Sequence, residues 1–230
     1  MSNKKYQVSM YKYDAVVFDL DGVVTRTARI HAAAWKDLFD EYLKKHSEDE
    51  TFEPFDSGAD YCKYVDGKPR YEGVKSFLAS RGIEVAYGNA DDSPDEETVC
   101  RLGNRKNRLF LKRLKSEGVQ VYESTIDLIG RLRKRGLKTA IVSSSKNCAD
   151  ILNRANITGL FDAKVDGMDS EGLDLTGKPE PDIFLESARR LDVKPKRCVK
   201  WKMPFQGSRP EVKGVLAWLS ELTGQGRKRC

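Results

Sequence analysis

Residues 16–21 read Val-Val-Phe-Asp-Leu-Asp, an apolar run that leads directly into two carboxylates. A parallel strand that is buried on both faces has this kind of continuous apolar sequence. The carboxyl ends of such strands form the edge at which open α/β sheets bind ligands. Two acids at that edge repel each other unless a cation or a proton relieves the repulsion. The run indicates either Mg²⁺-assisted phosphoryl chemistry or simply a strand that ends in an Asp-containing turn.

Strands and helices alternate along the rest of the chain, which predicts an α/β fold with a doubly wound parallel sheet. The expected elements are strands at residues 15–20, 138–143, 163–166 and 197–200, and helices at residues 124–135, 148–155 and 181–191.

The stretch that follows the first strand is polar and rich in helical patterns. Apolar residues recur at helical spacing over residues 30–42 and 97–114. We therefore predict a core, a helical insertion and a basic tail. The core is expected at residues 1–27 and 121–200, the insertion at residues 28–120 and the tail at residues 201–230.

Composition argues against membrane and secreted classes of protein. The chain has no apolar run near the ~20 residues of a membrane span, and its first residues lack the apolar core of a signal peptide. Its five cysteines include no Cys-x-x-Cys pair, which favours reduced thiols over a disulfide framework or a zinc site. We therefore expect a cytoplasmic protein that does not contact membranes.

The net charge of +6 is concentrated at one end of the chain. Residues 201–230 hold six basic side chains against two acidic ones, so +4 of the +6 lies there. No aromatic-interleaved basic stripe or base-reading motif accompanies this charge. We interpret the segment as a solvated tail and expect no nucleic-acid partner.

Four segments resemble the motifs of the haloacid dehalogenase superfamily of phosphohydrolases. They are residues 19–25 (Asp-Leu-Asp-Gly-Val-Val-Thr), 140–147 (Ala-Ile-Val-Ser-Ser-Ser-Lys-Asn), 177–182 (Gly-Lys-Pro-Glu-Pro-Asp) and 103–107 (Gly-Asn-Arg-Lys-Asn), the last together with His31 and Trp35. The last segment resembles the subgroup that contains β-phosphoglucomutase. The resemblance covers roughly residues 13–199 and implies a Rossmann-like core with an inserted helical cap.

The resemblance implies roles for the acidic and polar residues of the core. Asp19 would be the nucleophile that forms an aspartyl-phosphate, and Asp21 the general acid and base. Ser143 would bind a phosphoryl oxygen, although it could also cap the helix that follows it. Lys178 would neutralise the phosphate and the nucleophile. Asp19 and the backbone carbonyl of Asp21 would hold Mg²⁺.

The same resemblance implies residues that bind the substrate. Arg70 and Lys106 match positions in the cap that clamp a second phosphate, and His31 lies near the expected hinge. Ser144 and Asn147 belong to the segment that binds the transferred phosphate. The alternatives are a solvated Lys106, an ordinary interfacial His31, an unrelated loop position for Arg70 and a helix-capping Asn147.

The implied activity is phosphoryl transfer on a sugar phosphate, with hexose 1- and 6-phosphates interconverted as by β-phosphoglucomutase. One alternative is a small-molecule phosphatase. Another is a catalytically inactive sugar-phosphate binder or a non-functional product. We expect a monomer whose partner is the small-molecule substrate.

The resemblance stops at the fourth motif, where an acidic pair should follow the strand and supply a ligand for Mg²⁺. Residues 199–210 contain no acid. A shifted reading, which joins the last base of each codon to the first two of the next, restores the pattern. Joined in this way, the codons of Trp201 and Lys202 necessarily give Glu, and those of Lys202 and Met203 permit Asp. The codons of Met203 and Pro204 necessarily give Ala.

We therefore hypothesise that the chain is translated in a shifted frame from about residue 200 onward. The last core strand should then be missing, which leaves an open sheet edge. Apolar residues at helical spacing predict an accidental amphipathic helix over residues 211–222, and residues 224–230 should be disordered. Without the acid of the fourth motif, Mg²⁺ affinity and activity should both be low.

Overall fold

The computed structural model describes residues 12–47, 52–92, 96–178, 180–202 and 211–214. The chain forms two compact units, and each is described by itself. The first unit comprises residues 1–24, 121–176 and 180–230, and the second comprises residues 25–120 and 177–179. Within the described ranges, no helix is both long and apolar enough to cross a membrane.

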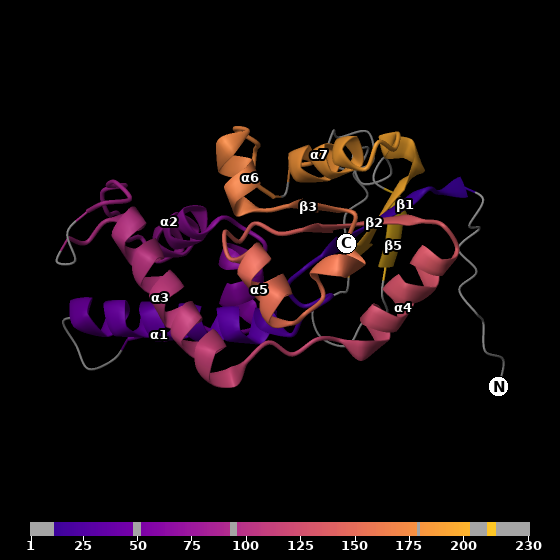
Figure 1. The fold of residues 1–230 in the computed structure, drawn as a ribbon. Helices are drawn as coiled ribbons and strands as arrows, with labels where there is room; N and C mark the ends of the chain where they lie inside the picture. The colour runs from indigo at the N-terminus through magenta and orange to yellow at the C-terminus, as the bar shows by residue number, and fades with distance from the viewer. Residues whose placement is uncertain (1–11, 48–51, 93–95, 179, 203–210, 215–230) are drawn as a thin grey trace. The chain divides into compact units, whose positions relative to one another are not determined.

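The first unit contains a five-stranded sheet in the order β3-β2-β1-β4-β5 (Figure 1). Its strands are β1 (Ala15–Asp19), β2 (Lys138–Val142), β3 (Ala163–Val165), β4 (Cys198–Lys202) and β5 (Glu211–Gly214). The first four are parallel, so the predicted α/β class and parallel sheet are confirmed. β1 lies between β2 and β4, and its apolar residues are at most 5% exposed, as expected for a strand covered on both faces.

Helices cover both faces of this sheet. α4 (Glu123–Lys134) and α5 (Cys148–Arg154) lie on one face and α7 (Asp182–Arg190) on the other (Figure 1). The short helix α6 (Gly167–Gly172) directly follows β3, and single 3₁₀ turns occupy Thr158–Leu160 and Pro195–Arg197. On the α7 side, the buried side chains of Val17, Val142 and Phe184 belong to one apolar cluster.

The second unit is helical. It contains α1 (Thr27–His46), a π-helical turn at Tyr61–Val65, α2 (Arg70–Ser80) and α3 (Val99–Glu117). Its core is aromatic: the rings of Trp35 and Phe39 stack at 5.1 Å, and Phe39 lies 4.1 Å from Phe77. These side chains come from α1 and α2, so burial of one apolar face of each helix holds this unit together.

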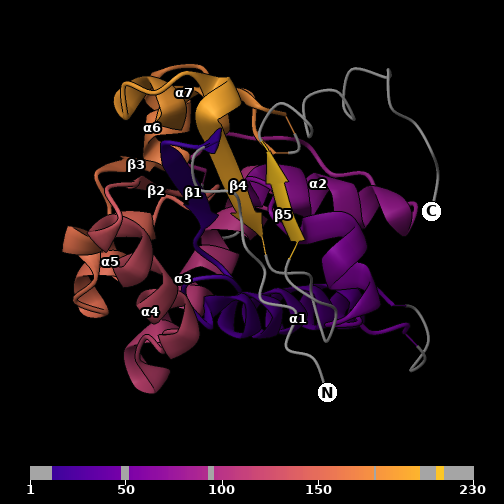
Figure 2. The same cartoon turned by 90° about the vertical axis from the view of Figure 1, so that its right-hand side faces the viewer.

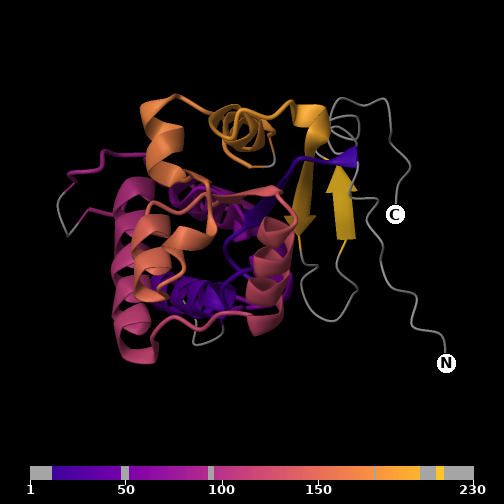
Figure 3. The same cartoon turned by 45° about the vertical axis from the view of Figure 1, so that its right-hand side comes forward.

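The edge of β4 is paired, which corrects the prediction of an open edge. β5 lies antiparallel to β4, with Trp201 opposite Val212 (Figures 2 and 3). The helix predicted over residues 211–222 is wrong for Glu211–Gly214, which form this strand. Unpaired backbone groups along β4 explain the change, because they offer a hydrogen-bonding template to any nearby segment. The predicted disorder of residues 224–230 lies outside the described residues.

The last part of β4 carries two side chains that fit a sheet interior poorly. Lys200 is 8% exposed, with its ammonium nitrogen 4.0 Å from the centre of the Phe184 ring. The indole Nε1 of Trp201 is buried and has no hydrogen-bond partner among the described residues. Burying a charge or an unpaired N–H costs free energy, so both residues oppose the packing of this strand.

We expect Lys200→Met to stabilise the protein, because it replaces a buried ammonium by an apolar side chain of similar length. The gain in the free energy of unfolding should be about 1 kcal/mol, since the lost cation–π contact and the other electrostatic interactions of the ammonium offset part of the relieved desolvation cost. Urea unfolding of both proteins measures it. Lys196→Met, at an exposed position just before β4, is the control. A loss of stability in Lys200→Met alone would show that the ammonium is well accommodated.

Candidate active site

The carboxyl ends of β1 and β2 meet at one edge of the sheet. Asp19 pairs in register with Val142, and the backbone N–H of Leu20 donates to the Val142 carbonyl over 3.1 Å. The next residue on β2, Ser143, donates its own N–H to the Val165 carbonyl of β3 over 3.1 Å. The sheet therefore brings the first two sequence motifs together within the first unit.

Asp21 and Ser143 are in direct contact at this edge. The Ser143 hydroxyl donates to Oδ2 of Asp21 over 3.2 Å and accepts the N–H of Ser145 over 3.1 Å. Ser143 is 1% exposed, whereas Asp19 and Asp21 are half-buried. Oδ1 of Asp19 accepts the N–H of Leu20 over 3.0 Å, which fixes the carboxylate against its own backbone. Two oriented carboxylates beside a hydroxyl can serve as a nucleophile and a proton carrier.

The loop after β2 holds the other predicted residues of the core. Ser144 and Asn147 are half-buried, and Asn147 occupies the cap position of α5 without a side-chain capping hydrogen bond. Instead, its N–H donates to the hydroxyl of Ser145 over 3.2 Å. The helix-capping alternative for Asn147 and Ser143 is thus not observed. Their binding of phosphate stays a prediction.

In the second unit, His31 and Lys106 are in contact although they lie far apart in the sequence. Nζ of Lys106 is 2.6 Å from Nδ1 of His31, and the His31 ring stacks on Phe110 at 4.0 Å. The ammonium also lies 4.8 Å from the centre of the Trp35 ring, and Lys106 is only 5% exposed. The solvated alternative for Lys106 is therefore wrong. Because an ammonium can only donate, Nδ1 of His31 accepts and the ring proton sits on Nε2.

Arg70 begins α2 and packs against α3. A Cβ at Gly103 would lie 2.6 Å from the Tyr71 ring, so a larger residue here would have to displace that ring. The Tyr71 hydroxyl donates to Asn104 over 3.0 Å, and Nη2 of Arg70 lies 3.4 Å from that hydroxyl. Nε of Arg70 is buried without a hydrogen-bond partner in the part of the chain that is described. Lys106 lies one turn further along α3, on the face that carries Gly103.

Lys178 belongs to a different unit from the one expected from the sequence. The core expected from the sequence, residues 121–200, includes Lys178, yet residues 177–179 group with the second unit. The reason is local packing: the Cδ atom of Lys178 lies 3.7 Å from the position of a Cβ on Gly67, and a Cβ on Gly177 would lie 2.8 Å from Cγ of Pro69. The role of Lys178 toward the nucleophile stays a prediction.

The donor set at the sheet edge suits Mg²⁺ but is small. Asp19 and Asp21 are hard oxygen ligands, and Mg²⁺ is commonly held by one or two carboxylates together with substrate phosphate and water. Among the described residues, no group of three or more His, Cys, Asp or Glu side chains could hold a metal ion. The neighbouring strand β4 ends in Trp201 and Lys202 rather than in acids.

Sequence reasoning missed Asp166 and Gly167, which follow β3. Gly167 touches the backbone of the Ser144–Lys146 stretch, and Asp166 caps α6. The sequence did hold a signal for the helix that begins here. Asp166 and Asp169 are three residues apart just after a strand, which is the spacing of a capping box.

Comparison with known proteins agrees with this geometry. A model of the haloacid dehalogenase-like hydrolase family matches residues 13–200. The β-phosphoglucomutase of Mycobacterium tuberculosis is 41% identical over 218 residues, 94% of this chain and 83% of that protein. The β-phosphoglucomutase of Bacillus subtilis is 34% identical over 80% of this chain and 72% of its own. A crystal structure of β-phosphoglucomutase from Clostridium difficile superimposes with a TM-score of 0.64 at 26% identity, covering 82% of this chain and 75% of that one.

Proposed function

The chain belongs to the haloacid dehalogenase-like hydrolase family, and we propose that it transfers the phosphoryl group of a sugar phosphate through an aspartyl-phosphate on Asp19. The observation that carries this proposal is the sheet edge at which Asp19 stands two residues from Asp21, whose carboxylate accepts the Ser143 hydroxyl. The resemblance to β-phosphoglucomutases supports the substrate class.

In the proposed reaction, a carboxylate oxygen of Asp19 attacks phosphorus while the bond from phosphorus to the sugar oxygen breaks. Asp21 gives its proton to that oxygen, and in the second half it takes a proton from the acceptor hydroxyl or water that attacks the aspartyl-phosphate. The Ser143 hydroxyl keeps the Asp21 carboxyl in place. Mg²⁺ held by Asp19 and the Asp21 carbonyl would neutralise charge on the phosphoryl oxygens.

The acceptor separates the two enzyme candidates. A mutase passes the phosphoryl group to a second sugar hydroxyl, whereas a phosphatase passes it to water. The named relatives favour a mutase, and the hydrolase family favours the phosphatase as second candidate. Incubation with β-glucose 1-phosphate and Mg²⁺ tests both: glucose 6-phosphate identifies the mutase and free phosphate the phosphatase. If neither product forms, the proposal that this chain is an active enzyme is wrong.

A third candidate is a sugar-phosphate binder without turnover. It is supported by the small donor set for Mg²⁺ and by the acid-free sequence of residues 199–210. Calorimetric titration with glucose 6-phosphate distinguishes it, because binding without product formation is expected only of this candidate.

We expect Asp21→Asn to slow turnover of a small aryl phosphate by roughly 10²–10⁴, the usual loss when a general acid–base is removed. The amide oxygen can still accept the Ser143 hydroxyl, so the free energy of unfolding should change little. Steady-state kinetics and urea unfolding measure the two effects. An unchanged rate would remove Asp21 from the acid–base role.

We expect Lys106→Ala to weaken binding of glucose 6-phosphate by about 10–100-fold, because a charge-assisted contact is lost. Turnover of p-nitrophenyl phosphate, which has no second polar group to clamp, should change much less. Lys112→Ala, an exposed lysine on the same helix, is the control. Equal losses on both substrates would place Lys106 outside the substrate clamp.

We also propose that residues from about 200 onward are translated in a shifted frame. The buried Lys200 supports this, as does the Trp201 indole, whose N–H has no hydrogen-bond partner among the described residues, because both fit a strand interior poorly. The family model stops at residue 200, while the Mycobacterium match covers 94% of the chain and so extends beyond it. The gene sequence around codon 200 decides: if the other frame lacks the Glu-Asp-Ala reading, the proposal is wrong.

A further inference from the structure

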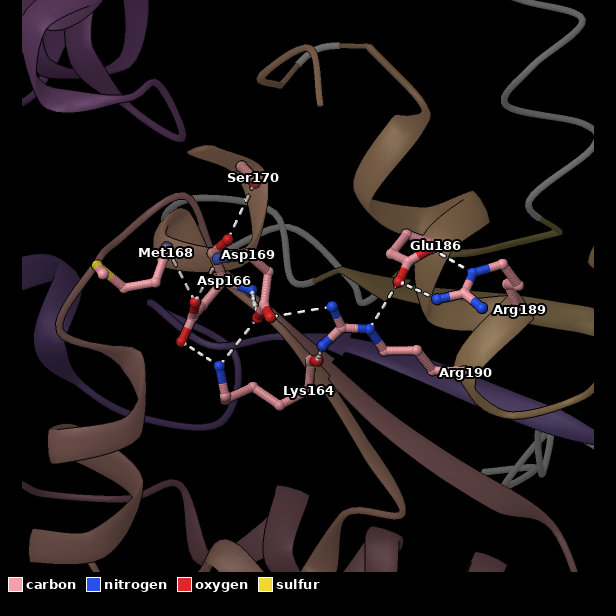
Figure 4. Close-up of polar contacts among 8 residues, drawn as sticks. All are labelled: Lys164, Asp166, Met168, Asp169, Ser170, Glu186, Arg189 and Arg190. Carbon is pink, nitrogen blue, oxygen red and sulfur yellow. Dashed lines mark hydrogen bonds and ion pairs between the residues drawn. The ribbon is translucent and has the colours of Figure 1, made fainter. Parts of the chain in front are cut away.

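An ion-pair network joins the carboxyl end of β3 to α6 and α7 (Figure 4). Lys164 pairs with Asp166 and, over 2.9 Å, with Asp169. Arg190 contacts Asp169 over 2.9 Å and Glu186 over 2.7 Å, and it donates to the Lys164 carbonyl over 2.6 Å. The network therefore ties the last turn of α7 to the start of α6.

Asp166 is the most buried acid of this network, at 1% exposure. Its Oδ1 accepts the N–H groups of Met168 and Asp169 over 3.0 and 3.2 Å, and Asp169 accepts the Asp166 N–H over 2.9 Å. These reciprocal bonds are a capping box, which fixes the first turn of α6. Burial alone would raise the pKa of Asp169, but the hydrogen bonds from Lys164, Asp166 and Arg190 hold it well below its usual range. The Asp169 carboxylate is thus charged at neutral pH, as its ion pairs with Lys164 and Arg190 require.

This fixed turn presses Gly167 onto the loop that carries Ser143. The Gly167 N–H donates to the Ser145 carbonyl over 3.2 Å. A Cβ on Gly167 would lie 2.7 Å from the Ser144 carbonyl oxygen and 2.8 Å from the Lys146 nitrogen. Both neighbours are backbone atoms, so a side chain here could be accepted only if the loop moved. The N–H of Ser145 in turn donates to the Ser143 hydroxyl, which donates to Asp21.

We propose that Gly167 is a positioning residue for the phosphoryl-transfer site, held in place by the Asp166–Asp169–Arg190 network. It acts by backbone contact on the Ser144–Lys146 loop, and so sets the Ser143 hydroxyl against Asp21. The inference rests on the proposed function for its catalytic consequence. Its structural content, that Gly167 fixes the loop, stands independently.

The first test compares Gly167→Ala with Gly172→Ala. Gly172 lies at the other end of α6, where an added Cβ meets nothing within 4 Å. In Gly167→Ala, hydrogen–deuterium exchange over residues 143–147 should accelerate roughly tenfold, with exchange in β4 and α7 unchanged. Gly172→Ala should match the parent. Unaltered loop exchange in Gly167→Ala, or acceleration throughout the unit, would overturn the proposal.

The catalytic readout is p-nitrophenyl phosphate turnover. Displacing Ser143 should lower kcat about 10–100-fold in Gly167→Ala with KM within about twofold, because misplaced catalytic groups affect the chemical step. An unchanged kcat together with a loosened loop would overturn the positioning role. If the parent protein turns over no phosphate ester, the proposed function fails, and the exchange measurement alone decides what Gly167 does.

A second pair of variants covers the case in which Gly167→Ala does not fold. Arg189 and Arg190 both pair with Glu186, but only Arg190 also reaches Asp169 and the Lys164 carbonyl. Arg190→Gln should therefore accelerate exchange of the 143–147 loop, by a few-fold, and Arg189→Gln should not. Equal effects of the two substitutions would overturn the role of the network.

Discussion

Asp19→Asn should abolish turnover of phosphate esters, with a loss of at least about 10⁴-fold. An amide oxygen cannot act as the nucleophile that forms an acyl-phosphate, so no covalent phosphoryl-enzyme should accumulate. The fold should persist, because the amide oxygen can accept the same N–H of Leu20 as Oδ1 does now. Rates on p-nitrophenyl phosphate, and intact-protein mass spectrometry after rapid acid quenching, measure the two effects.

The matched control is Asp14→Asn, at the residue that directly precedes the same strand. Asp14 pairs with Arg197, and that guanidinium lowers the pKa of the Asp14 carboxyl, so the substitution removes a charge and an ion pair without touching the sheet edge. It should leave turnover unchanged. Retained turnover in Asp19→Asn would exclude Asp19 as nucleophile and would direct the search to another acceptor of the phosphoryl group.

The strands of the core could be predicted closely from the sequence because local pattern determines them. β1 was expected at residues 15–20 and is Ala15–Asp19, and β2 was expected at residues 138–143 and is Lys138–Val142. Both contain short apolar runs, Ala15–Phe18 and Ala140–Val142, that end at polar residues, as is typical of parallel strands buried on both faces. The contact between Asp21 and Ser143 follows from this, because parallel neighbours end at one edge.

Long-range pairings could not be predicted from local pattern. β5 forms from a segment whose apolar spacing favours a helix, because the free edge of β4 offers hydrogen bonds that the segment alone cannot reveal. The contact of Lys106 with His31 joins residues 75 positions apart, and only the packing of α1 on α3 creates it. α6 has only six residues, which is too short to show a helical spacing of apolar residues. The contact of Gly167 with the loop that carries Ser143 could therefore not be predicted from the sequence.

Restoring the alternative reading frame from about codon 200 should raise both Mg²⁺ affinity and turnover. The restored segment would replace Lys200 and Trp201 at the end of β4 and would place a Glu-Asp pair at the edge that holds Asp19. A further carboxylate adds a hard ligand and a negative charge, so Mg²⁺ should bind at least about tenfold more tightly. Calorimetric titration with MgCl₂ measures the affinity, and the Mg²⁺ dependence of p-nitrophenyl phosphate turnover measures the activity.

A point variant separates the missing acid from the missing strand. Trp201→Glu combined with Lys202→Asp supplies two carboxylates near the sheet edge but leaves the rest of the tail unchanged. It should recover part of the Mg²⁺ affinity and less of the turnover, because Lys200 stays buried in β4 and the strand after it is not rebuilt. The frame-restored protein should recover both. If the present chain is already fully active at about 1 mM Mg²⁺, one carboxylate and one backbone carbonyl suffice for a metal that keeps most of its water ligands, and the fourth-motif acid is dispensable here.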